Sequence, residues 1–177
     1  MAIFKNRFTA QDTLLVFVAC AFPVHVWAIV NLLNAMPGWI LRFDAWDLVG
    51  VIGYSLSFAL LESLLLFSVG MLAGFFLPAR WLKDCVACIS TAVFIAVAGT
   101  IGLYLSDVNL GFWSTAKFVL VGGGYLFVAG ISFFAIHRFQ KLAKIIRAVI
   151  NRLVVLSMVY VFFDLLGVLI VIIRNMT

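Results

Sequence analysis

The sequence predicts an all-α fold: a polytopic integral membrane bundle of five transmembrane helices, with a basic amphipathic helix at the membrane interface. Hydrophobic residues make up 66% of the 177 residues and charged residues only 11%, whereas soluble domains are about half apolar and a quarter charged. The apolar residues gather in runs of roughly 20 or more, the length that crosses a bilayer as a helix. The segments between these runs are short, so we expect residues 1–177 to form a single membrane domain.

The first two spans differ in the polar residues that they carry. Residues 13–33 form the first span, in which Pro23 removes a backbone donor and is expected to kink the helix. Two basic residues precede this run, as in a signal peptide, but the run continues well past Cys20. We therefore expect it to remain as a transmembrane helix. Residues 48–77 form the second span, and its single charged residue, Glu62, lies at its centre.

The remaining spans are predicted at residues 85–105, 115–136 and 153–173. Between the last two, residues 138–152 separate apolar from cationic side chains when they are placed at about 100° per residue. Such a helix suits the membrane surface, where its cations contact anionic phospholipids. The cations expected to do so are Arg138, Lys141, Lys144, Arg147 and Arg152. The alternative is that the fourth span extends into the cytoplasm and packs on its neighbours.

The positions of the basic residues predict the orientation of the chain in the lipid bilayer. Nine of the twelve Lys and Arg residues fall at the N-terminus, in the 78–84 turn and in the 137–152 connection, which share one side. The positive-inside rule places that side in the cytoplasm. We therefore expect a bacterial inner (plasma) membrane protein with a cytoplasmic N-terminus and an outer C-terminus. The net charge of +5 is attributed to this orientation, and no nucleic-acid partner is expected.

Two carboxylates near the middle of spans form the main candidate site. Glu62 in the second span and Asp164 in the fifth lie at similar depth, with His25 of the first span slightly outside the midplane. A carboxylate in lipid is costly, so these groups are expected to meet each other, His25, water or a partner chain. If Glu62 and Asp164 were adjacent they would share a proton. Ser63 and Tyr160 flank this proposed ion or proton path, whose alternative is hydrogen-bonding contact between helices.

Small residues at helical spacing mark faces where helices approach closely. In lipid, such residues and polar bridges drive helix association. We expect packing contacts, either within the chain or with another subunit, at Ser55, Ala59, Gly70, Gly74 and Gly167.

A cysteine pair offers a weaker candidate for redox chemistry. Cys85 and Cys88 form a C-x-x-C at the start of the third span, where a helix N-terminus lowers the pKa of a thiol. The string CVACIST resembles the active-site segment of vitamin K epoxide reductase relatives, which implies thiol oxidoreductase activity. That family needs a second, loop cysteine pair, whereas only Cys20 remains here. No metal site or cofactor is expected, because His25 and His137 are too far apart to bind haem together.

These observations lead to three functional hypotheses. The first is a non-enzymatic membrane subunit or accessory protein of a larger complex, associating with other membrane subunits or with itself. The alternative is a small proton- or cation-linked transporter or channel that uses Glu62 and Asp164. The minor alternative is a membrane thiol oxidoreductase that uses Cys85 and Cys88.

Overall fold

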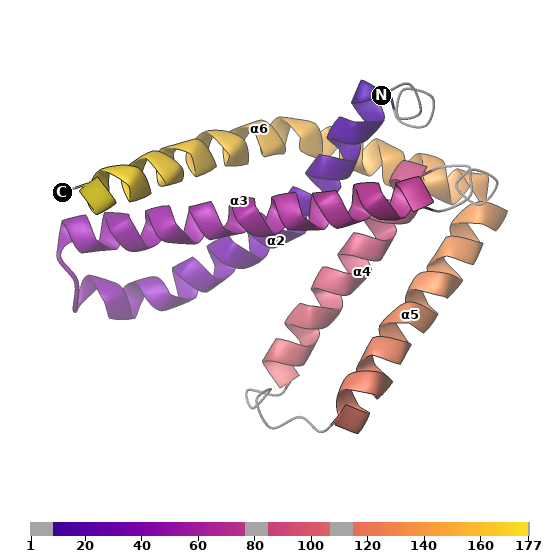
Figure 1. The fold of residues 1–177 in the computed structure, drawn as a ribbon, viewed down its shortest axis with the longest axis horizontal. Coiled ribbons are helices and arrows are strands. Elements are labelled where there is room, and N and C mark those ends of the chain that lie inside the picture. The colour runs from indigo at the N-terminus through magenta and orange to yellow at the C-terminus, as the bar shows by residue number, and fades with distance from the viewer. Residues whose placement is uncertain (1–8, 77–84, 107–114, 177) are drawn as a thin grey trace.

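The computed structural model of the chain describes residues 9–76, 85–106 and 115–176, and every element in these ranges is an α-helix. The prediction of an all-α fold is confirmed. Figure 1 shows the helices in chain order. They are α2 (Ala10–Ile40), α3 (Ala45–Phe76), α4 (Cys85–Ser106), α5 (Thr115–Arg138) and α6 (Gln140–Met176).

Three of these helices, α2, α3 and α6, are long and apolar enough to cross a membrane. The helices α4 and α5 contribute shorter apolar segments, Val86–Ile101 and Gly122–Ile136. Large apolar side chains are also exposed along most of the described surface, such as Phe127 at 69% and Val155 at 72%. These features agree with an integral membrane protein, while five spans remain a prediction.

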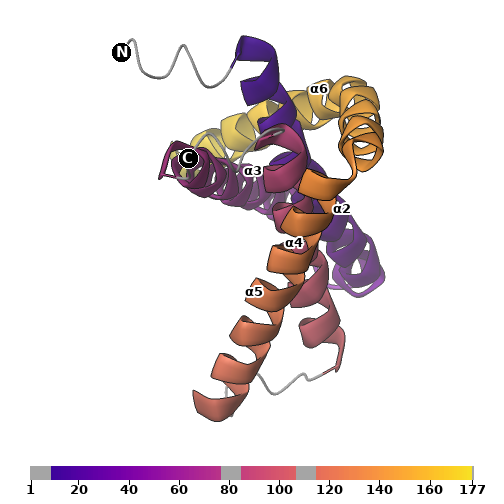
Figure 2. The ribbon, with the colours of Figure 1, turned by 90° about the vertical axis from the view of Figure 1, so that its right-hand side faces the viewer.

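The helices form a three-helix unit from which a hairpin projects. Helices α3 and α6 lie side by side, and α2 crosses them and contacts α4 as well (Figure 1). Figure 2 shows α4 and α5 leaving this unit together at a steep angle. The apolar core surrounds the N-terminal half of α2, where Leu15, Val16 and Val18 are buried against Ile89 of α4 and Ile150 of α6.

Helix α2 is bent, its first turns running more steeply than the rest (Figure 1). Pro23 and Pro37 both lie inside this helix. A proline inside a helix leaves one carbonyl without its usual partner and bends the axis. The bend turns the second half of α2 away from the core, and from Val26 to Ile40 its residues are half-buried or exposed.

The structure differs from the sequence prediction at the expected interfacial helix. Instead of a separate helix over 138–152, residues 140–176 form one continuous helix, and the interruption lies at Phe139. No glycine or proline lies between Gln140 and Asp164, so the change from cationic to apolar residues does not break the helix. Its first part also packs on protein, because Ala143 and Ile150 are buried in the core.

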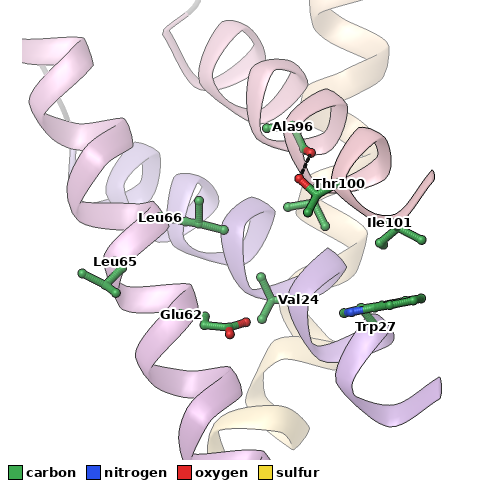
Figure 3. Close-up of a pocket in the computed structure, with 9 residues that line it drawn as sticks. Val24, Trp27, Glu62, Leu65, Leu66, Ala96, Thr100 and Ile101 are labelled. Atoms are coloured by element: carbon green, nitrogen blue, oxygen red, sulfur yellow. Dashed lines mark hydrogen bonds between the residues drawn. The ribbon is translucent and has the colours of Figure 1, made fainter. Parts of the chain in front are cut away.

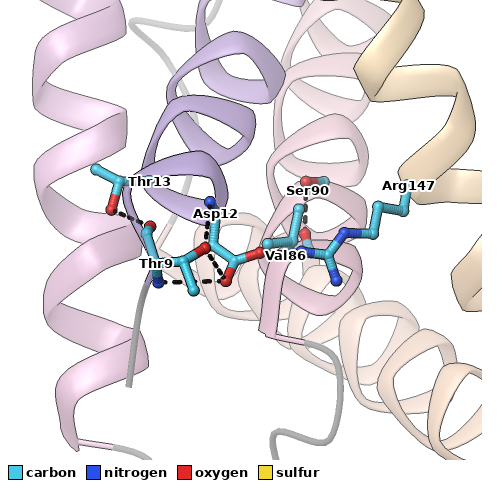
Figure 4. Close-up of polar contacts among 6 residues, drawn as sticks. All are labelled: Thr9, Asp12, Thr13, Val86, Ser90 and Arg147. Carbon is cyan, nitrogen blue, oxygen red and sulfur yellow. Dashed lines mark hydrogen bonds and ion pairs between the residues drawn. The ribbon is translucent and has the colours of Figure 1, made fainter. Parts of the chain in front are cut away.

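Ion pairs join α6 to the other helices near its two ends. The N-terminus of α2 is closed by a capping box, in which the Thr9 hydroxyl accepts from the Asp12 amide at 3.1 Å. Arg147 of α6 pairs with the Asp12 carboxylate (Figure 4). At the other end of α6, Arg174 pairs with Asp47 in the first turn of α3 at 2.5 Å. These contacts fix how α6 lies along α2 and α3.

Candidate functional site

A stripe of buried residues on α6 carries the first part of the candidate site. The buried residues of this helix are Ala143, Ile150, Ser157, Asp164 and Gly167. The first four recur at intervals of seven residues, which returns to nearly the same face of an α-helix. The stripe therefore forms a seam against the neighbouring helices, and Asp164 lies fully buried inside it.

Asp164 contacts His25, which is 1% exposed and lies on the buried half of α2. The His25 Nε2 atom lies 3.0 Å from Oδ1 and 2.9 Å from Oδ2 of Asp164. The other ring nitrogen, Nδ1, lies 2.7 Å from the carbonyl oxygen of Ala21. Tyr160 stacks on the imidazole, with ring centroids 5.0 Å apart and an angle of 11° between the planes.

This geometry determines how many protons the pair holds. A carbonyl oxygen only accepts, so Nδ1 must carry a hydrogen and donate it to Ala21. The Nε2 atom and the Asp164 carboxylate then need one further proton between them, on the imidazole or on the carboxyl group. Both arrangements give the pair zero net charge. A neutral pair is the form that a dry helix interface accommodates at the lowest cost.

This pair joins α2 to α6 through a polar contact that carries no net charge. Both side chains are closed off from the surface, since their exposed fractions are 2% and 1%. Proton exchange with water therefore requires α2 and α6 to separate locally. In the closed arrangement the pair is a neutral, dry contact.

The structure places Glu62 apart from this pair. Asp164 is bonded to His25, and in the described part of the chain no hydrogen bond or ion pair reaches the Glu62 carboxylate. Glu62 is exposed on α3. Its neighbour Ser63 is 0% exposed and donates its hydroxyl to the Ala59 carbonyl at 2.7 Å. The structure therefore brings His25, Asp164 and Tyr160 together and leaves Glu62 outside that group.

Glu62 lies where two open pockets meet. One pocket, of about 480 Å³, lies between α2, α3 and α4, and Figure 3 shows the Glu62 side chain directed into it. The second, of about 550 Å³, lies between α2 and α3. Both are lined by Val24, Trp27 and Glu62. Trp27 was not singled out from the sequence. A weak signal was available, because Trp27 and Ala35, which both line the α2–α3 pocket, are eight residues apart on α2.

The predicted packing residues take different roles. Gly167 meets Gly53 of α3, and a Cβ added to Gly167 would lie 3.0 Å from the Gly53 carbonyl oxygen. Gly70 faces Ile89 of α4, and a Cβ added to Gly70 would lie 3.0 Å from the Ile89 Cγ2 atom. The others are buried or line a pocket: Ala59 and Gly74 are buried, whereas Ser55 lines the α2–α3 pocket. Gly53 was missed, although it occupies the same kind of small-residue position in the second span.

The predicted cations also divide into two groups. Arg147 pairs with Asp12 of α2. The other four are exposed: Arg138, Lys141, Lys144 and Arg152.

Of the predicted redox pair, the structure describes Cys88, which lies in an apolar cluster with Ala87, Ile136 and Ala143. The side chain of Cys85 lies outside the described residues. Cys20 is buried on α2 and is a free thiol, and Cys88 is buried on α4. Within the described ranges, no group of three His, Cys, Asp or Glu side chains is arranged to hold a metal ion.

No protein-family model, curated protein or solved structure matches this chain.

Proposed function

We propose that this chain is a non-enzymatic integral membrane subunit or accessory protein with five transmembrane helices, which assembles with another membrane helix. The observation that supports this proposal most strongly is a third pocket, of about 420 Å³, between α3, α4 and α5. Five of its lining residues have the smallest side chains: Gly70, Ala73, Ala92, Ala96 and Gly130. Small residues let helix backbones approach closely, and close packing drives helix association in lipid.

Helix α5 carries further glycines on its open surface. A Cβ added at Gly122, Gly123, Gly124 or Gly130 would meet no described residue within 4 Å. Glycine weakens a helix interior relative to alanine, so four glycines facing only lipid would be a cost without a contact in return. A partner helix lying along α5 would use the space that they leave.

We propose the predicted orientation together with this function: a cytoplasmic N-terminus, an outer C-terminus and α4–α5 crossing the bilayer. The described lengths allow it, since helices of 22 and 24 residues reach about 33 and 36 Å, against a hydrocarbon thickness of about 30 Å. The test is labelling from outside with a membrane-impermeant maleimide in a cysteine-free background. Asn109→Cys should be labelled if α4 and α5 both cross, and protected if they do not. Asp44→Cys is the control for an outer position.

The assembly itself is tested by photo-crosslinking in native membranes. A photoreactive residue placed at Ala92, in the α3–α4–α5 pocket, should form a discrete adduct with one membrane chain. The same residue at Val155, which is 72% exposed on α6, serves as the control and should give mainly lipid adducts. Mild-detergent purification followed by native mass spectrometry should recover the same partner. Quantitative recovery as a monomer, with equal crosslinking at both positions, would refute the proposal.

A second candidate function, a small proton- or cation-linked transporter, is favoured by the buried His25–Asp164 contact, which joins two ionisable side chains inside two long helices. This hypothesis predicts that Glu62→Gln and Asp164→Asn each abolish proton or cation flux into proteoliposomes while the protein stays folded. Absence of flux with the unmodified protein, or flux that both variants retain, would exclude it.

A further inference from the structure

The junction of the two pockets at Glu62 contains a negative group without a complementary one. The pockets of about 480 and 550 Å³ share Val24, Trp27 and Glu62. Among the described residues that line either pocket, none is a lysine, arginine or histidine. His25 follows Val24 in the sequence, but its ring is engaged with Asp164 and Ala21. Glu62 is therefore the one charged side chain among the described residues that line these two pockets.

The depth of Glu62 makes this arrangement costly without a ligand. It lies near the middle of α3, about 25 Å from one end and about 21 Å from the other at 1.5 Å per residue. A carboxylate at that depth has little access to water, and such groups mark ligand or ion sites in membrane proteins. A cation bound beside it would offset the cost of the charge.

The lining residues indicate an organic cation with an apolar body. The α2–α3 pocket includes Trp27, Trp39 and Phe58, and aromatic faces attract cations within about 6 Å. A divalent metal instead needs about six oxygen ligands, whereas the acidic side chain here is single. The pocket volumes fall within the range of about 300–1,000 Å³ that is usual for small-molecule sites.

From these observations we infer that the junction at Glu62 is a binding site for an amphiphilic organic monocation. The cationic centre lies at the Glu62 carboxylate, and the apolar body occupies the two pockets against Trp27 and Leu65 (Figure 3). The site is distinct from the α3–α4–α5 pocket of the proposed assembly, and its test does not depend on whether a partner chain is found.

Binding is tested with radiolabelled tetraphenylphosphonium and the full-length protein in lipid nanodiscs, with empty nanodiscs as background. Saturable binding is expected, and Glu62→Gln should weaken it at least tenfold because the counter-charge is lost. Trp27→Leu should weaken it about threefold. Asp44→Asn, which removes a carboxylate outside both pockets, is the matched control and should change the affinity by less than twofold.

A second measurement uses the unmodified chain and so does not depend on how the variants fold. A hydrophobic carbodiimide should modify Glu62, and saturating tetraphenylphosphonium should slow that modification at least fivefold, as read by peptide mass spectrometry. Modification of Asp44 should proceed at the same rate with and without the cation. Equal binding to empty nanodiscs, or a Glu62 modification rate that the cation leaves unchanged, would overturn the proposal. So would a carbodiimide crosslink from Glu62 to a lysine of a co-purified chain, because it would place a protein partner in the site.

Discussion

Replacing His25 by leucine is expected to loosen the contact between α2 and α6. The substitution leaves the Asp164 carboxyl group buried, with an exposed fraction of 0%, and removes the ring nitrogen that lies within 3.0 Å of both of its oxygens. Tyr160 also loses the imidazole on which it stacks. The helices themselves need not unfold, so the effect should appear in how they associate.

The expected magnitude follows from the dry, neutral state of the pair. Breaking a buried ion pair costs about 3–5 kcal/mol in soluble proteins, whereas polar contacts between membrane helices average about 0.6 kcal/mol and reach about 1.7. The stranded Asp164 carboxyl group then stays buried without the hydrogen-bond partner that His25 provides. We therefore expect His25→Leu to lower the free energy of unfolding by about 2–3 kcal/mol, about 30- to 150-fold in the equilibrium constant.

The assay is a double-mutant cycle in mixed micelles, with reversible unfolding by dodecyl sulfate followed by tryptophan fluorescence. Asp164→Val should cost about 1–2 kcal/mol, because His25 Nε2 loses its partner. His25→Leu/Asp164→Val should be within about 1 kcal/mol of the unmodified protein, since an apolar pair leaves nothing unsatisfied. Of the single variants, Asp164→Asn should lower the free energy of unfolding least, because the Asn amide can donate a hydrogen bond to His25 Nε2. A His25→Leu loss below about 0.5 kcal/mol, or strictly additive single costs, would refute the reasoning.

Three further substitutions test the packing and the ends of the bundle in the same assay. Gly167→Ala should lower the free energy of unfolding by about 1–2 kcal/mol, because its Cβ would lie 3.0 Å from a backbone carbonyl of α3 that cannot move aside. The control, Gly123→Ala, lies in open space and should be neutral or stabilising. Equal effects at both sites would count against the α3–α6 contact. Gly99→Ala should destabilise the protein, because the new Cβ would clash with the Tyr125 ring. Adding Tyr125→Ala should restore the lost stability. If it does not, α4 and α5 do not meet at this point. Arg174→Gln should lower the free energy of unfolding by less than about 1 kcal/mol, because the side chain of its partner Asp47 is 47% exposed. This loss should become smaller as the salt concentration is raised. A loss above about 2 kcal/mol would mean that the pair is far more buried.

The helices were predictable because their signal is local. The sequence places spans at 48–77, 85–105 and 115–136, and the structure has helices over Ala45–Phe76, Cys85–Ser106 and Thr115–Arg138. Runs of apolar residues between polar segments determine such boundaries without knowledge of the tertiary structure. The continuous α6 was missed because polarity was taken as a sign of a helix end. A change of polarity alters what surrounds a helix, whereas glycine, proline and caps terminate it.

The partner of Asp164 could not be derived, because depth in the membrane does not determine the rotation of a helix about its axis. His25 and Glu62 lie near the middle of α2 and α3, and Asp164 lies about two thirds of the way along α6. One residue step turns the side chain by about 100°, and that step separates the exposed Glu62 from the buried Ser63. Which residue faces α6 depends on long-range contacts, such as the approach of Gly53 to Gly167. The seven-residue stripe on α6 that includes Asp164 was recognised only from the burial pattern in the structure.

The distribution of polar contacts separates a fixed part of the molecule from an open part. Helix α6 is joined to α2 and α3 at its beginning, middle and end, through Arg147, Asp164 and Arg174. On α4, by contrast, the hydroxyls of Ser90 and Thr100 donate to carbonyls of their own helix, so they satisfy themselves without fixing a neighbour. Apolar contacts alone specify orientation weakly, because lipid competes for the same surfaces. The α4–α5 hairpin, whose described residues form no ion pair with the other helices, borders both the pocket at Glu62 and the pocket at Gly130. A ligand at the first pocket and a helix at the second would therefore influence each other through the position of one hairpin.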